Sequence, residues 1–134
     1  SNMVGGGNKP IDDLLKIMFE HKILIKMLHF QSKSYGFHKT LDIYLNTFNL
    51  NFDKLLEVLQ GNMNQQINTS NISIDISMLN DNNIIEYLKN FKKNFIGIIN
   101  IIINADPNET NSISNIKDVI ITEIDNLVYL LMFK

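Results

Sequence analysis

The sequence contains no cysteine and no tryptophan. Without thiols the chain can form no disulfide and use no thiol nucleophile, and any metal site must be built from nitrogen and oxygen ligands. An excess of either charge is also lacking, since the formal net charge is −2 and the pI is about 5.8. Proteins that bind nucleic acid through its phosphates carry a concentrated basic face, so we do not expect nucleic acid as a partner.

Long hydrophobic runs are also missing. The most apolar stretch, FIGIINIIINA at 95–105, is interrupted by Asn100 and Asn104, and it is much shorter than the roughly 20 residues of a membrane-spanning helix. The first residues show no charged region leading into an apolar one, so they do not resemble a secretory signal. We therefore expect a cytoplasmic protein without a membrane segment.

The length and composition predict one globular domain. The chain has 134 residues, of which 45% are hydrophobic and 19% charged, as is typical of a single folded domain. Residues 1–9, SNMVGGGNK, are interpreted as a flexible N-terminal segment that begins with a tag remnant before Met3. The folded domain is expected to span residues 10–134.

Apolar residues recur at helical spacing in four segments, about 10–31, 37–60, 81–105 and 112–134. The link between the first two is short, with the sequence SKSYG, whereas the connection over 61–80 is long and rich in turn-forming residues. Gly61 is predicted to end the second helix and Asp81 to cap the third, and Ile72, Ile74 and Ile76 alternate as in an extended segment. The sequence thus predicts an all-α, ferritin-like four-helix bundle with a long crossover between helices 2 and 3.

Two histidines and three carboxylates between residues 29 and 57 are candidate metal ligands: His29, His38, Asp42, Asp53 and Glu57. On a helical projection with His38 at zero, the three carboxylates of the second helix fall between about 40° and 100°. They form one polar stripe beside the apolar face that is expected in the core. The stripe therefore borders the core without being part of it.

The two halves of this stripe cannot form one site within a single chain. His38 and Asp42 are one turn apart, and so are Asp53 and Glu57, but about 15 residues, or roughly 22 Å of helix, separate the pairs. Two copies of the helix packed antiparallel about a two-fold axis would bring the pairs together in two identical sites. Ile43 and Leu50, which are apolar where solvent is expected, support such a contact, although two exposed aliphatic residues are also common on monomers.

These residues follow the pattern H-F-x7-H-x3-D-x10-D-x3-E, which resembles the ferroxidase signature of the Dps-type miniferritins. The segment HFQSKSY at 29–35 and the ending NIKDVIITEIDNLVYLLMFK are similar to short ferritin-like proteins of phages and large DNA viruses. The resemblance implies an iron site across a dimer interface, with His29, His38 and Asp42 from one chain and Asp53 and Glu57 from its mate. It leaves open whether the protein is a dimer or a dodecameric cage.

The function implied is that of a ferroxidase, which oxidises Fe(II) with dioxygen or peroxide in iron detoxification or oxidative stress, with zinc or manganese as alternative ions. Two other functions remain open at this point. One is a viral structural or interaction protein that keeps the bundle without catalysis, in the host cytoplasm or the virion. The other is zinc-dependent hydrolysis or nucleic-acid processing at the same cluster.

Other polar residues are given simpler interpretations. His21 projects about 80° away from His29 on the first helix, and it is predicted to be a surface or interface histidine. Lys89, Lys92 and Lys93 are predicted to form a solvated helix face.

Overall fold

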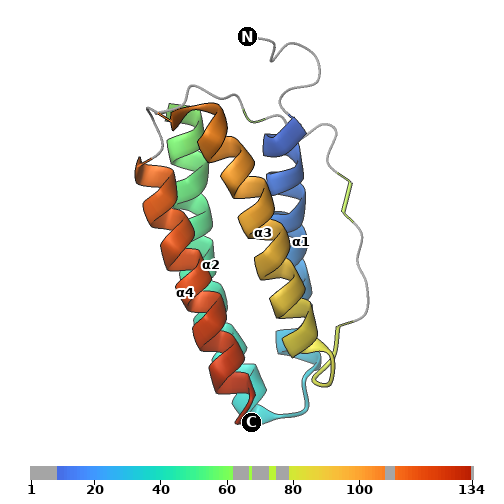
Figure 1. Cartoon of the computed structure of the whole chain (residues 1–134). Helices are drawn as coiled ribbons and strands as arrows, with labels where there is room; N and C mark the ends of the chain where they lie inside the picture. The colour runs from blue at the N-terminus through green and yellow to red at the C-terminus, as the bar shows by residue number, and fades with distance from the viewer. Residues whose placement is uncertain (1–8, 62–66, 68–72, 75–78, 108–110, 134) are drawn as a thin grey trace.

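The computed structural model describes residues 9–61, 67, 73–74, 79–107 and 111–133. Within these residues the chain forms four α-helices and no strand: α1 (Lys9–Gln31), α2 (Tyr35–Gly61), α3 (Ile84–Ala105) and α4 (Asn111–Leu131) (Figure 1). The predicted all-α four-helix bundle is confirmed, and the helices begin within a few residues of their predicted starts. Among the residues described, no helix is both long and apolar enough to cross a bilayer.

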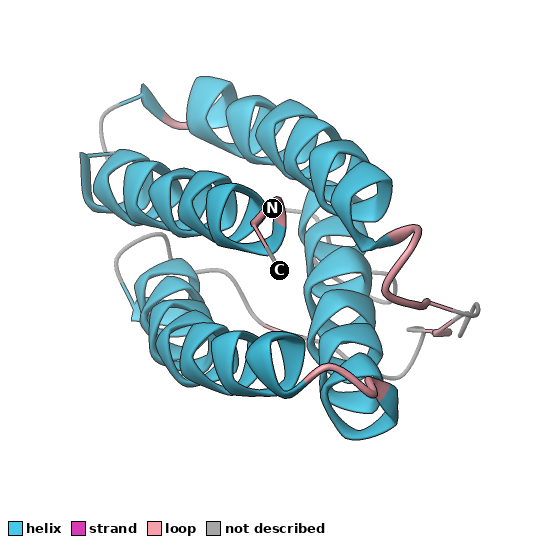
Figure 2. Ribbon diagram, turned by 90° about the horizontal axis from the view of Figure 1, so that it is seen from below, coloured by secondary structure: helices cyan, strands magenta, loops and turns pink. Residues whose placement is uncertain are grey.

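Each helix packs mainly on two neighbours, in the circular order α1, α2, α4, α3, which is visible in the view along the bundle (Figure 2). The helix α2 ends and α3 begins at opposite ends of the bundle, so these two run parallel on a diagonal (Figure 1). All neighbouring pairs are antiparallel. This arrangement has the predicted long crossover between the second and third helices, as in ferritin-like bundles.

The starts of α2 and α3 differ by two or three residues from the predicted positions. The helix α2 begins earlier than expected because the Ser34 hydroxyl accepts a hydrogen bond from the Phe37 amide at 3.2 Å, as an N-cap residue does. The N-cap of α3 is Asn83, so the prediction that Asp81 caps this helix is wrong. Asp81 instead accepts a hydrogen bond from the Ser32 hydroxyl at 3.0 Å, which ties the start of α3 to the link between α1 and α2.

The predicted extended segment lies mostly outside the described residues. Ile72 and Ile76 are not described, and Ile74 is half-buried without regular secondary structure. Gly61 is the last residue of α2, as predicted for the end of this helix.

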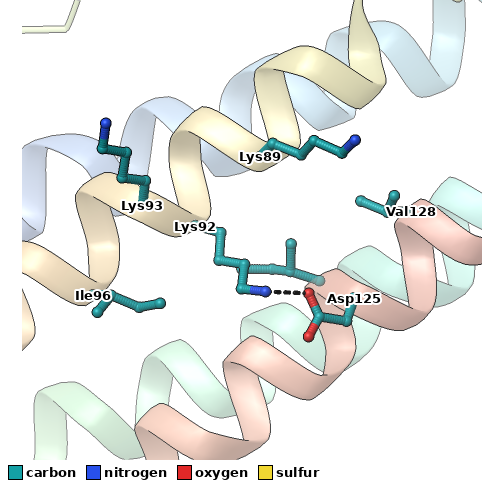
Figure 3. Close-up of a pocket in the computed structure, with 7 residues that line it drawn as sticks. Lys89, Lys92, Lys93, Ile96, Asp125 and Val128 are labelled. Atoms are coloured by element: carbon teal, nitrogen blue, oxygen red, sulfur yellow. Dashed lines mark hydrogen bonds and ion pairs between the residues drawn. The ribbon is translucent and has the colours of Figure 1, made fainter.

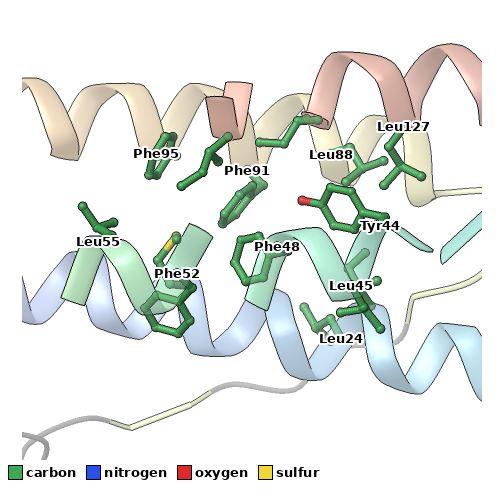
Figure 4. Close-up of a cluster of buried hydrophobic side chains, with 14 of the residues drawn as sticks. Leu24, Tyr44, Leu45, Phe48, Phe52, Leu55, Leu88, Phe91, Phe95 and Leu127 are labelled. Atoms are coloured by element: carbon green, nitrogen blue, oxygen red, sulfur yellow. The ribbon is translucent and has the colours of Figure 1, made fainter. Parts of the chain in front are cut away.

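The core is apolar along all four helices (Figure 4). At its centre the diagonal helices meet, with the ring of Phe48 from α2 at 6.5 Å from the ring of Phe91 from α3. Phe95 continues the same row on α3, with its ring 6.1 Å from that of Phe91. Each of these rings buries a large apolar surface and so helps to stabilise the bundle. One polar side chain, His21, is packed against the rings of Phe48 and Phe91.

Candidate metal centre

His29 and His38 are brought together where α1 ends and α2 begins. The His29 Nδ1 atom lies 2.8 Å from the backbone carbonyl oxygen of His38, and the His38 Nδ1 atom lies 2.7 Å from the carbonyl oxygen of His29. The two imidazole rings stack with their centroids 3.9 Å apart and 19° between their planes. The carbonyl of His29 belongs to the last turn of α1, where helical donors run out, so His38 satisfies an acceptor that needs a partner.

These two hydrogen bonds fix the tautomer of both rings. A carbonyl oxygen only accepts, so each Nδ1 must carry the proton and donate it. In the neutral ring the other nitrogen, Nε2, then holds a lone pair. Histidines that bind metal ions through Nε2 commonly donate Nδ1–H to a backbone carbonyl or a carboxylate in this way, which orients the ring. Each imidazole therefore has the tautomer that ligation through Nε2 would require.

Asp42 lies next to this pair. Its Oδ1 atom is 4.0 Å from the Nε2 atom of His29. Nitrogen and oxygen ligands lie about 2.1 Å from a divalent ion such as zinc, so two ligands of one ion can be at most about 4.2 Å apart. The observed distance permits both atoms to bind the same ion. His29 is only 6% exposed, whereas Asp42 is exposed and open to a partner.

The other two candidates, Asp53 and Glu57, are exposed on later turns of α2. Within the described residues of a single chain, no group of three or more histidine and acidic side chains is arranged to hold a metal ion. The sequence placed Asp53 and Glu57 in the site of a second subunit, and the single chain does not test that prediction.

The apolar residues that flank this acidic stripe are exposed, as expected. Ile43 is 59% exposed and Leu50 is 64% exposed, and their spacing of seven residues places them on the same side of α2. At the end of the bundle near the histidines, Phe30 and Tyr35 are also exposed. The face of α2 that carries Asp42, Asp53 and Glu57 therefore also presents apolar surface to solvent.

His21 is a polar site that the sequence interpretation missed. It is fully buried, so its prediction as a surface or interface residue is wrong. Its Nε2 atom lies 2.6 Å from the hydroxyl of Tyr44, and its Nδ1 atom lies 2.9 Å from the hydroxyl of Tyr87. The ring stacks on Phe91 at 3.8 Å. The spacing with Met18 and the other buried residues of α1 was the signal that places position 21 in the core.

The buried network shifts the titration of its members. Burial lowers the pKa of His21 from 6.5 to about 3, because the charged imidazolium would lose its hydration. Burial raises the pKa of Tyr44, and the nearby Tyr87 and Glu123 raise it further. Burial likewise raises the pKa of Tyr87, with a smaller effect from Glu20. His21 is therefore neutral in the fold, with one ring nitrogen donating to a tyrosine and the other accepting.

Comparison with known proteins identifies a family whose function is unknown. The model of a family of unknown function, DUF5856, matches residues 29–131. This range begins at His29 and includes all five candidate ligands. No curated protein and no solved structure matches the chain.

Proposed function

The chain belongs to the DUF5856 family of unknown function, and we propose that it is an iron-binding ferroxidase whose metal site is shared between two subunits. The observation that carries the proposal is the histidine pair, in which His29 and His38 each donate Nδ1–H to the other's backbone carbonyl. Both Nε2 lone pairs are thereby left for a metal ion. Asp42 adds a carboxylate next to this pair, with its Oδ1 atom 4.0 Å from Nε2 of His29.

This half-site has a single carboxylate, that of Asp42, and a second copy of α2 can supply two more. If two copies of this helix pack antiparallel with the two-fold axis near residue 47, Ile43 of one chain faces Leu50 of the other, and the histidine end of each chain faces Asp53 and Glu57 of its mate. The exposure of both aliphatic residues supports this contact, because an isologous interface would remove them from water. The same packing repeats the site, so a dimer holds two.

The proposed reaction takes Fe(II) as substrate. Two Fe(II) ions each give up one electron to one molecule of hydrogen peroxide, which takes up two protons and yields two molecules of water. The imidazoles and carboxylates bind the ions, and the carboxylates balance the charge that rises as Fe(II) becomes Fe(III). Glu57, one turn from Asp53, can bridge two ions. Dioxygen is the alternative oxidant, and the consequence for the cell is protection from iron and peroxide together.

Removing the carboxylates of Asp53 and Glu57 tests directly whether the protein oxidises Fe(II). We expect the Asp53→Asn/Glu57→Gln variant to lose nearly all Fe(II) oxidation, by about 100-fold, since carboxylates supply the anionic ligands. The rate is measured as the formation of Fe(III) by absorbance after aerobic addition of Fe(II) to metal-free protein, with and without peroxide. Both residues are exposed, so the fold should persist, which circular dichroism checks.

A matched control removes two carboxylates elsewhere. Glu86 on α3 and Asp118 on α4 are also exposed, and the Glu86→Gln/Asp118→Asn variant has the same net charge as the test variant. Its oxidation rate should equal that of the wild type. Equal rates in all three proteins, or rates no higher than that of Fe(II) in buffer, would refute the ferroxidase.

The subunit contact has its own test. We expect Ile43→Asp/Leu50→Asp to convert the dimer to a monomer without unfolding it, because both side chains are exposed in the single chain and become buried only in the proposed contact. The molar mass in solution is measured by sedimentation equilibrium. Ile101→Asp is the control, since this residue is 56% exposed on α3 and lies outside α2. A wild-type monomer, or a double variant that still dimerises, would exclude this interface.

A second candidate function is a structural or interaction protein that uses the same bundle without catalysis, as in a virion component. It is favoured by the reciprocal hydrogen bonds between His29 and His38, which already give both residues a structural role. Its hydrogen-bonded histidines would then serve only to join α1 to α2. Under this alternative the protein still associates through α2, but the carboxylate variant and the wild type are equally inactive with Fe(II).

A further inference from the structure

A groove of about 530 Å³ lies between α3 and α4, away from the proposed metal site. Its apolar walls are Ile96, Ile124 and Val128, and three lysines of α3 stand at its rim. Figure 3 shows Lys92 reaching across the groove to Asp125, with Ile96 on one side of this pair and Val128 on the other. The volume is in the range of small-molecule binding sites, which are typically about 300–1,000 Å³ and mostly apolar.

The charges of the groove are unbalanced. Lys92 is paired with Asp125, with 2.6 Å between Nζ and Oδ1, but neither Lys89 nor Lys93 forms an ion pair with any residue that the structure describes. Lys89 and Lys93 are four residues apart on one helix, a spacing at which like charges destabilise the helix. An anion bound near either lysine would reduce this repulsion.

The walls and the rim together define the chemistry of the ligand. The apolar side chains of Ile96 and Val128 are half-buried, so they can bury more apolar surface when a ligand covers them. The lysine rim favours an anionic head group, and Asp125 shows that a carboxylate can pair with one of these lysines, Lys92. We propose that the groove between α3 and α4 binds a free medium-chain fatty carboxylate, with its chain along Ile96 and Val128 and its carboxylate at the lysine rim.

The experiment uses decanoate as the probe, below the concentration at which it forms micelles, and isothermal titration calorimetry with the full chain. We expect saturable binding with one site per chain. Decanol, which keeps the chain but not the charge, and acetate, which keeps the charge but not the chain, should each bind at least about tenfold more weakly. Amide chemical shifts should change on decanoate addition near Lys92, Ile96 and Val128.

Two variants separate the lysine rim from the apolar walls. Lys89→Gln/Lys93→Gln and Ile96→Gln should each weaken decanoate binding by about tenfold or more. The charge-matched control is Lys39→Gln/Lys54→Gln, on exposed positions of α2, the helix diagonal to α3, and it should bind decanoate as the wild type does. If the wild type shows no saturable binding, if decanol binds equally well, or if Lys89→Gln/Lys93→Gln binds unchanged, the proposal is wrong.

Discussion

Two inactive variants, mixed and allowed to form dimers together, should recover about one quarter of the wild-type rate of Fe(II) oxidation, because each isologous dimer holds two shared sites. One variant is His38→Asn, which carries an amide nitrogen in the place of Nδ1 and nothing in the place of Nε2. It keeps a donor for the His29 carbonyl and loses the ligand atom. The other is Asp53→Asn/Glu57→Gln, which keeps both histidines.

The recovery follows from which chain supplies which half of each site. A mixed dimer has one site in which both halves are altered and one in which both are intact. Random pairing makes about half of the dimers mixed, so about one quarter of all sites are complete. The same fraction holds in a larger assembly built from such dimers. No arrangement of the ligands within one chain gives this result.

The measurement compares each variant alone with an equimolar mixture that has been unfolded and refolded together. A mixture of separately refolded variants, kept below the time needed for subunit exchange, is the control and should stay inactive. Wild-type protein taken through the same procedure sets the scale. If the co-refolded mixture is as inactive as its components, the site is not shared between subunits.

Acid should destabilise the bundle through His21. Between pH 7 and pH 5 we expect the wild type to lose about 2 kcal/mol of its free energy of unfolding relative to a His21→Gln variant, at 1.36 kcal/mol for each pH unit below the unfolded pKa of the imidazole. Glutamine offers one amide donor and one carbonyl acceptor to Tyr44 and Tyr87, and it does not titrate. The two proteins differ only at position 21, so the contributions of the residues they share cancel in the comparison.

The sign follows from the folded pKa of about 3, which lies below the unfolded value of 6.5. Below pH 6.5 the unfolded chain takes up a proton on His21 and the folded chain does not, so protons favour unfolding. The contribution is fully present above pH 6.5 and is lost as the pH falls towards 3. Urea unfolding at a series of pH values measures it. If the free energies of unfolding of the wild type and His21→Gln change equally with pH, the prediction is wrong, and His21 becomes charged without opening the core.

The helices were predictable because each carries its own signals. Apolar spacing located all four, and on α2 it also assigned the faces correctly, with Phe48 buried and Ile43 exposed. These are properties of one helix at a time. The connectivity followed from the lengths of the links, since a short link forces neighbouring helices to be antiparallel and a long one allows a crossover.

Contacts between segments distant in sequence were not predictable in the same way. Asp81 is a residue type that often caps helices, but it accepts a hydrogen bond from Ser32. This contact depends on how two segments distant in sequence approach each other. Tyr44 lies on the apolar face of α2, which the helical spacing assigns to the core, but its hydrogen bond with His21 depends on the relative rotation of α1 and α2. The approach of His29 to His38 was expected, whereas the reciprocal hydrogen bonds that fix both tautomers depend on how the end of α1 packs against the start of α2.

Because both acceptors of the histidine pair are backbone carbonyls, no substitution at a neighbouring side chain can delete them. The orientation of the two imidazoles is thus protected against most point mutations in the surrounding residues. This orientation is sensitive to insertions and deletions instead, since residues 32–34 determine the position of α2 relative to α1. One residue gained or lost in that link would offset the two helices and break both hydrogen bonds at once. Length, more than composition, is the property of this segment on which the site depends.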